Sequence, residues 1–436
     1  MNKSEQLFSK AVKYLPGGVS RNTIFRKPYP YYAEKGEGCY VTDVEGVTRI
    51  DFANNMASLI HGHAYTPIVE AVSAQLAKGS CFTMATTAEV DYAQLLCERV
   101  PSFDKIRFVN SGTEAVMAML KAARAYTGKA KIAKVEGAYH GAYDYAEVSQ
   151  TANPSNWGDV DKPSSIPVAV GTPEKALEDV VIIPFNDVDR ALNILNQHKD
   201  EIACVLVDLL PHRVGLIPAS DEFVCALRKW ADDNAALLVF DEVITFRTNY
   251  SGAQQNYSVD PDLTAMGKVI GGGFPAGALA GCDKVMKVLD PTEPKVLLPH
   301  SGTFSANPIT MTAGLIAMRD FDQAAVEKLN ALATYARAEI TKVISDVGIA
   351  ACVTGAGSMF RVHLKAEPPK NYRQAYADKN ESKLISELLD HMFDNGVMMI
   401  NTCSATLSTQ MTTKEIDHLV TTLKSGFEML KPKMAK

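Results

Sequence analysis

A lysine and an aspartate stand in surroundings that could bring both into one buried site. Lys268 is followed closely by Gly271, Gly272 and Gly273, so its side chain could reach a pocket past a backbone with few side chains. Burial favours the neutral amine, and a neutral lysine amine can form a Schiff base with a carbonyl group. Asp241 ends an apolar run upstream, where its carboxylate could keep a ring nitrogen protonated.

Two further motifs could complete a cofactor site. Ser111, Gly112 and Thr113 lie between a short apolar run and a helix pattern, and the free N–H groups and dipole of such a junction attract anions. Tyr139 and His140 lie in a turn bounded by glycines, where the tyrosine ring could stack on a planar ligand. Taken singly, each motif also has a structural explanation: a helix cap, a packed aromatic, a surface acid or a surface lysine. Together they match one cofactor, pyridoxal 5′-phosphate (PLP).

The elements that must position these residues have the pattern of an α/β protein. Short apolar runs, each typical of a buried strand, cover residues 106–110, 132–135, 180–183, 203–207 and 236–240. Helix patterns, among them 115–126, 187–197 and 221–232, lie between most of them. This alternation predicts a mostly parallel sheet with helices on both faces. Ligands bind such sheets beyond the carboxyl ends of the strands, where Asp241 lies.

The two ends of the chain differ from this central part. Residues 31–52 alternate apolar runs with glycine turns, as in a β-meander, and the chain becomes mainly helical after about residue 310. We therefore predict a large domain over residues 56–310, and a smaller α+β domain that combines the N-terminal segment 1–55 with the C-terminal part 311–436. Residues 151–174 carry four prolines and no periodicity, which is typical of an active-site lid or a disordered loop.

Composition favours a cytoplasmic enzyme. The net charge of −6 offers no electrostatic case for binding nucleic acid or a membrane surface. The eight cysteines show no C-x-x-C spacing, so we expect no metal site and no redox dithiol, only free thiols in a reducing compartment. No apolar stretch is long enough for a signal peptide or a membrane span.

With these motifs in place, the chain resembles the class III (omega) aminotransferase family of PLP enzymes, which have fold type I. The likeness runs from residues 14–18 (YLPGG) to the C-terminal helix and is most specific over residues 261–273, with 111–115 and 241–243 in support. Within the family, the chain looks most like the branch that holds glutamate-1-semialdehyde aminomutase and the β-amino-acid aminotransferases. The resemblance implies a large domain with a mostly parallel seven-stranded sheet.

The resemblance also implies a role for each matching residue. Lys268 matches the lysine that holds the cofactor as a Schiff base and later moves the proton, and Asp241 matches the partner of the pyridine nitrogen. Val243 and Tyr139 match the residues on the two faces of the cofactor ring, with His140 beside them. Pyridoxamine 5′-phosphate is the other form of the cofactor in the implied cycle.

A second group of residues matches those that bind the phosphate of the cofactor. Ser111, Gly112 and Thr113 match the cradle that binds the phosphate. Thr303 matches a threonine that reaches the phosphate of the neighbouring subunit, which implies a homodimer with shared active sites.

Departures from the family pattern bear on the substrate. Arg21 stands where the β-amino-acid aminotransferases carry an arginine that binds a substrate carboxylate, a task that suits its planar fork. Many family members have a Glu-Pro pair where this chain has Asp208 and Leu209, so the roles of Asp208 and of nearby Arg213 stay open. Residues 401–404 (NTCS) lack the second arginine of those enzymes.

The leading hypothesis is therefore an aminotransferase that moves an amino group between a small amino acid or amine with one carboxylate, β-amino acids included, and a keto acid. The alternatives are an intramolecular aminomutase of the glutamate-1-semialdehyde type and a PLP lyase on the same scaffold. A phosphate-binding protein without Schiff-base chemistry is a hypothesis of a different class.

Overall fold

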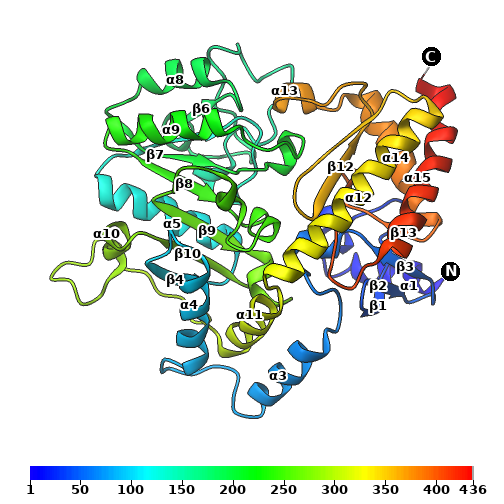
Figure 1. The fold of residues 1–436 in the computed structure, drawn as a ribbon, viewed down its shortest axis with the longest axis horizontal. Coiled ribbons are helices and arrows are strands. Elements are labelled where there is room, and N and C mark those ends of the chain that lie inside the picture. Colours follow the sequence, from blue (N-terminus) through cyan, green and yellow to red (C-terminus); the bar gives the residue numbers. More distant parts are fainter. Residues whose placement is uncertain (435–436) are drawn as a thin grey trace.

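A seven-stranded sheet forms the larger part of the computed structural model, which describes residues 1–434 (Figure 1). Its strand order is β4-β10-β9-β8-β7-β5-β6. The bounds are β4 Lys105–Val109, β5 Lys131–Val135, β6 Val180–Ile183, β7 Ile202–Val207, β8 Leu237–Asp241, β9 Leu263–Gly267 and β10 Gly277–Gly281. Only β10 runs antiparallel to its neighbours, and the predicted mostly parallel sheet of fold type I is confirmed.

Helices cover both faces of this sheet because its strands are apolar on both sides. In β7, Val205 and Val207 pack with helices α8 (Val188–Asn196) and α9 (Asp221–Asp233), whereas the alternate residues Cys204 and Leu206 pack with α5 (Gly112–Thr127). Successive strand side chains point to opposite faces, so one continuous apolar run supplies two cores.

A smaller part of the fold is built from both ends of the chain. Strands β1 (Ala33–Glu37), β2 (Tyr40–Asp43) and β3 (Thr48–Asp51) form the predicted antiparallel meander, and β13 (Val397–Met398) adds to β3 in parallel. Strands β11 (Cys352–Thr354), β12 (Met359–His363) and β14 (Ser404–Thr406) form a separate sheet. The domain boundaries near residues 55 and 310 stay a prediction.

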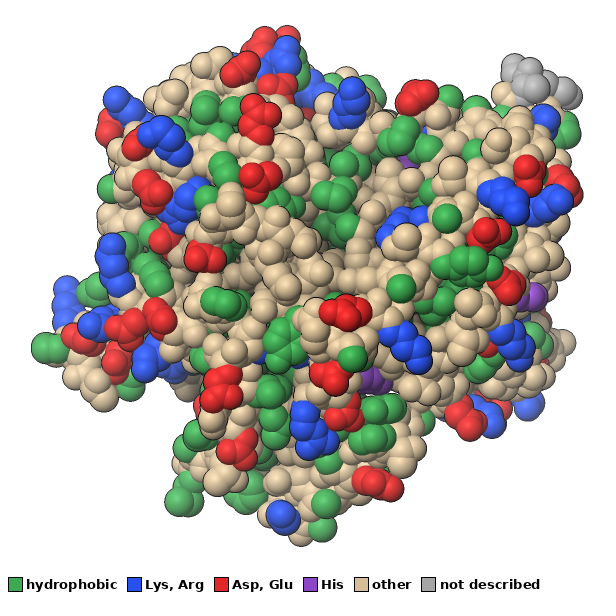
Figure 2. All heavy atoms as spheres, viewed as in Figure 1, with side chains coloured by type: hydrophobic (Ala, Val, Ile, Leu, Met, Phe, Trp, Pro, Cys, Tyr) green, Lys and Arg blue, Asp and Glu red, His purple; other side chains and the backbone are tan. Residues whose placement is uncertain are grey.

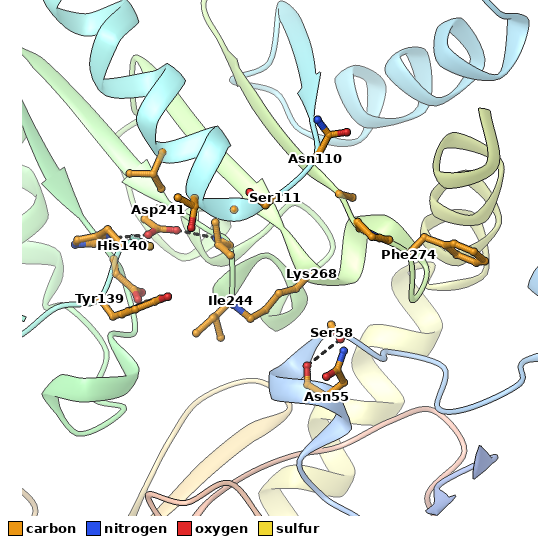
Figure 3. Close-up of a pocket in the computed structure, with 18 of the residues that line it drawn as sticks. Asn55, Ser58, Asn110, Ser111, Tyr139, His140, Asp241, Ile244, Lys268 and Phe274 are labelled. Atoms are coloured by element: carbon orange, nitrogen blue, oxygen red, sulfur yellow. Dashed lines mark hydrogen bonds and ion pairs between the residues drawn. The ribbon is translucent and has the colours of Figure 1, made fainter. Parts of the chain in front are cut away.

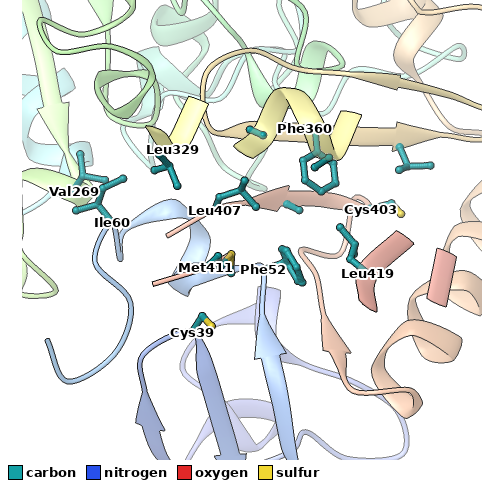
Figure 4. Packing of buried hydrophobic residues seen from close by; sticks show 14 of the residues in the cluster. Cys39, Phe52, Ile60, Val269, Leu329, Phe360, Cys403, Leu407, Met411 and Leu419 are labelled. Atoms are coloured by element: carbon teal, nitrogen blue, oxygen red, sulfur yellow. The ribbon is translucent and has the colours of Figure 1, made fainter. Parts of the chain in front are cut away.

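Helices fill the remaining space around these sheets. Their bounds are α1 Lys3–Ala11, α3 Thr66–Leu76, α4 Thr87–Arg99, α11 Pro308–Asp320, α12 Gln323–Val347, α14 Lys379–Asp394 and α15 Thr413–Met434. Figure 4 shows Phe52, Phe360 and Leu419, from segments far apart in sequence, meeting in one buried cluster. Over residues 1–434, no helix has the length and apolarity needed to cross a membrane.

One buried arginine ties the large sheet to both chain ends. Arg247 lies just after β8, and its Nε donates to Ser358 Oγ at 2.9 Å. Its Nη1 donates to the carbonyl of Ala57 at 3.2 Å, and its Nη2 donates to the carbonyl of Leu407. Burial lowers the pKa of this guanidinium to about 9. The fork therefore joins the chain after β8 to the segment at Ala57 and to two segments of the C-terminal part.

Replacing Arg247 should destabilise the whole protein. In Arg247→Ala, buried acceptors lose their donors, and we expect the free energy of unfolding to fall by about 3 kcal/mol or more. Arg247→Lys keeps the charge but not the planar fork of donors. Its free energy of unfolding should lie between those of the wild type and Arg247→Ala. Urea denaturation followed by circular dichroism measures both variants. A change in Arg247→Ala within about 0.5 kcal/mol, as at an ordinary surface site, would contradict this role.

Candidate active site

A cavity of about 570 Å³ opens at the carboxyl edge of the large sheet (Figure 3). Nine of the ten predicted site residues line it: Arg21, Ser111, Gly112, Thr113, Tyr139, His140, Asp241, Val243 and Lys268. The tenth, Thr303, is exposed in the loop that precedes α11 and lies outside this cavity. The cavity thus gathers groups from loops that follow β4, β5, β8 and β9, together with the N-terminal segment.

Asp241, the last residue of β8, is fixed through both carboxylate oxygens. Oδ1 accepts a hydrogen bond from the Val243 N–H at 2.9 Å, and Oδ2 lies 2.7 Å from His140 Nδ1. Burial lowers the pKa of His140 more than Asp241 raises it, so the imidazole is neutral at pH 7 and Nδ1 carries the donated proton. This arrangement holds an acceptor carboxylate at the cavity wall, as a protonated ring nitrogen requires.

The N-terminus of α5 forms an anion cradle. Ser111 caps the helix by accepting from the Glu114 N–H at 3.1 Å, and the N–H groups of Gly112 and Thr113 have no partner within residues 1–434. A Cβ at Gly112 would lie 2.7 Å from Val243 Cγ1, so only glycine allows this close approach. The open N–H groups and the helix dipole suit a phosphate.

Lys268 enters the cavity from the turn after β9. Its backbone has φ of 52°, a left-handed conformation that is uncommon and strained for residues other than glycine. Burial lowers the pKa of its amine, opposed by the nearby Asp241 and Asp208 carboxyls. Figure 3 shows the side chain extending toward Ile244, and no residue of the described chain accepts a hydrogen bond from Nζ. The amine is therefore free to react with a carbonyl.

Arg21 supplies a cationic group from the N-terminal segment. Its Nη1 donates to Asn55 Oδ1 at 2.8 Å, and the side chain is otherwise exposed to the cavity. Asn55 itself has φ of 47° and, with Ser58, lies below Lys268 in Figure 3. The guanidinium keeps free N–H groups that could receive a carboxylate.

Asp208 is a second acid at the site, one whose role the sequence left open. It follows β7, is buried, and accepts from the Leu210 N–H at 2.9 Å. Burial, and then the neighbouring Asp241, raise its pKa well above the usual range of a carboxyl. Asp208 therefore stays protonated more readily than an exposed aspartate. Its position at a strand end, like that of Asp241, was the signal that it would reach this edge.

Other lining residues carried no recognisable signal. Asn55 lies in the short turn α2 (Asn54–Ala57), and Ile244 and Phe274 lie in irregular segments. Their residue types are unremarkable, and only the folded chain brings them to the cavity. Within residues 1–434, no group of three His, Cys, Asp or Glu side chains is arranged to hold a metal ion.

A mostly parallel sheet whose carboxyl edge carries an anion cradle, an anchored acid and a free lysine amine defines a PLP-dependent enzyme of fold type I. The aminotransferase class-III family model matches residues 24–425, and the chain belongs to that family. It is accordingly a PLP-dependent class III aminotransferase.

Individual relatives agree on the family and differ in activity. A glutamate-1-semialdehyde 2,1-aminomutase of Methanothermobacter thermautotrophicus is 35% identical over 433 residues, which cover 98% of this chain and 99% of that protein. An omega-transaminase from Sphaerobacter thermophilus is 44% identical with a TM-score of 0.96, covering 98% of this chain and 97% of that one. A beta-phenylalanine aminotransferase from Variovorax paradoxus is 32% identical with a TM-score of 0.86, covering 99% and 94%.

The roles of Asp241 and His140 can be tested by removing the charge of the acid and the donor of the histidine. Asp241→Asn keeps the shape but cannot stabilise a protonated ring nitrogen, so turnover should fall about a hundredfold or more. PLP should still bind, as visible absorbance would show. His140→Asn, whose amide can donate to the same oxygen, should lose less activity than His140→Ala. Equal activity in Asp241→Asn and the wild type would contradict the assignment.

Proposed function

We propose that the enzyme transfers an amino group between a small amino acid or amine with one carboxylate, β-amino acids included, and a keto acid. The observation that carries this proposal is that Arg21 and Lys268 line the same cavity, with free guanidinium N–H groups and a free amine. A carboxylate on Arg21 would orient the substrate amine toward the reacting lysine. The related beta-phenylalanine aminotransferase and omega-transaminase support this substrate range.

When bound, PLP supplies the carbonyl carbon for a Schiff base and a ring that withdraws electrons from the substrate. In the proposed mechanism, the Lys268 amine would take the proton from the amine-bearing substrate carbon and would deliver it to the carbon that the cofactor's carbonyl supplies. A lowered pKa favours this role because it raises the share of the unprotonated, basic amine. Asp241, oriented by His140, would keep the ring nitrogen protonated. Ser111, Gly112 and Thr113 would hold the phosphate, and Val243 and Tyr139 would contact the two ring faces.

An aminomutase is the second candidate, and one finding favours it. The 35% identity to the glutamate-1-semialdehyde 2,1-aminomutase extends over nearly all of both chains. The same residues would serve both reactions, because a mutase differs in starting from the pyridoxamine form and retaining its intermediate. What separates the two is whether a keto acid from solution is needed.

We also propose a homodimer in which Thr303 reaches the phosphate of the partner's site. Apolar side chains are exposed near this loop: Phe82 is 52% and Phe304 58% exposed, and Asn307 Nδ2 joins their segments by donating to the Ser80 carbonyl. Figure 2 shows hydrophobic side chains among charged ones along the protruding lower edge, where α3 and α4 lie. Large apolar side chains that are exposed close together are typical of a protein interface. Light scattering measures the mass of the enzyme in solution. An enzyme that is monomeric by this measurement and still fully active would overturn the proposal.

The proposed location is the cytoplasm. All eight cysteines fall within the described residues and are free thiols, as a reducing compartment allows.

The acceptor requirement tests the reaction type. With carboxylate-bearing amines, turnover should need an added keto acid and should disappear in Lys268→Ala, which lacks the reacting amine. The measurement is product formation by chromatography with and without the acceptor. Isomerisation of an amino aldehyde without a keto acid would establish the mutase instead, and ammonia release without an acceptor would indicate a lyase.

Arg21 tests the substrate class. In Arg21→Ala, the loss of the carboxylate contact should raise KM for carboxylate substrates at least about tenfold, since charged hydrogen bonds contribute roughly 1.5–3 kcal/mol. Amines without a carboxylate should be turned over as by the wild type. Arg21→Lys should recover part of the affinity. An equal loss on both substrate types would assign Arg21 a structural role.

A further inference from the structure

The loop of residues 136–159, which carries Tyr139 and His140, is bound by side chains from several other elements. It follows β5 and contains one short helix, α6 (Asp144–Glu147). Several of its carbonyls accept hydrogen bonds from buried or half-buried donors: Ala138 and Val148 from Lys134 Nζ, Gln150 from Arg213 Nη1, Ala152 from Tyr372 Oη, and Trp157, Gly158 and Asp159 from Arg373. Its conformation therefore depends on those donors.

Arg373 makes the most extensive of these contacts. Its Nε and Nη2 each lie 2.9 Å from an oxygen of Glu136, a fork-to-carboxylate pair, and Glu136 is only 4% exposed. The guanidinium also lies 5.0 Å from the centre of the Trp157 ring. One side chain thus binds both the start of the loop, three residues before Tyr139, and its end at 157–159.

Tyr372, the neighbour of Arg373, fits beneath the same loop. Gly137 has φ of 75°, and a Cβ there would lie 2.0 Å from Tyr372 Cδ2, so the tyrosine ring occupies the space a side chain would need. Its hydroxyl donates to the Ala152 carbonyl at 2.6 Å. Both residues lie in α13 (Tyr372–Ala375), which belongs to the C-terminal part and reaches the large domain in Figure 1.

We infer that Arg373 and Tyr372 are positioning residues through which the C-terminal part of the chain sets Tyr139 and His140 against the cofactor. This inference rests on the proposed cofactor contacts of Tyr139 and His140. His140 would transmit the position to Asp241 through their 2.7 Å hydrogen bond.

The test removes the pair without leaving a buried charge unpaired. In the double variant Glu136→Gln with Arg373→Met, PLP should bind about tenfold more weakly, and kcat should fall about tenfold. The fluorescence of Trp157, measured in a Trp230→Phe background that removes the only other tryptophan, should also change because the guanidinium leaves its ring. Cofactor affinity is measured by visible absorbance on titrating the apoenzyme with PLP.

A matched control comes from the meander near the N-terminus. Arg49 and Asp43 form a comparably sheltered pair, 2.7 Å apart, that touches neither residues 136–159 nor α13. The double variant Arg49→Met with Asp43→Asn should bind PLP as the wild type does. If both double variants lose PLP affinity and kcat equally, Arg373 acts only through general stability and the inference is overturned. A wild-type enzyme that fails to bind PLP would instead overturn the proposed function.

Discussion

The site depends on burying an amine and two carboxyl groups together at one edge of a sheet. Burial disfavours the charged form of each group, so the hydrogen-bond partners of a group decide whether it can stay charged. Lys268 has no partner within the described chain and its pKa falls, whereas Asp208 has one backbone donor and its pKa rises. Asp241 alone receives a donor at each oxygen. One fold therefore holds an amine of lowered pKa near an anchored carboxylate, which is the pairing that PLP chemistry uses.

Close backbone approach is the second requirement of the same edge. Gly112 lies against Val243, and a Cβ at Gly277 of β10 would stand 2.1 Å from the Ser111 carbonyl oxygen. These glycines allow the N-terminus of α5, Asp241 of β8 and the turn that carries Lys268 to line one cavity. Larger residues would push the cradle away from the other two, so packing density at the strand ends is a condition for assembling the site.

Much of the central domain was predictable because its strands are buried on both faces and read as uninterrupted apolar runs. Strands β4 to β8 and helices α5, α8 and α9 follow the prediction closely. Strands β9 and β10 were missed, since threonine in one and glycines in the other hide the apolar run. Contacts between distant residues could not be predicted: His140 and Asp241 are 101 positions apart, and Arg373 and Glu136 are 237 apart. Such pairs are set by the folded topology, which periodicity does not encode.

This topology decides which part of the chain supplies the groups for the cofactor and which supplies the group for the substrate. The groups assigned to the cofactor come from the central sheet, where strand ends converge and packing is tight. The group assigned to the substrate, Arg21, comes from the N-terminal segment, and the loop under Tyr139 is supported from the C-terminal part. Arg21 makes one side-chain hydrogen bond, to Asn55, so it can change without disturbing Lys268 or Asp241. A family that keeps one chemistry and varies its substrates would be expected to vary first at positions such as Arg21, where a guanidinium held by one hydrogen bond faces the cavity.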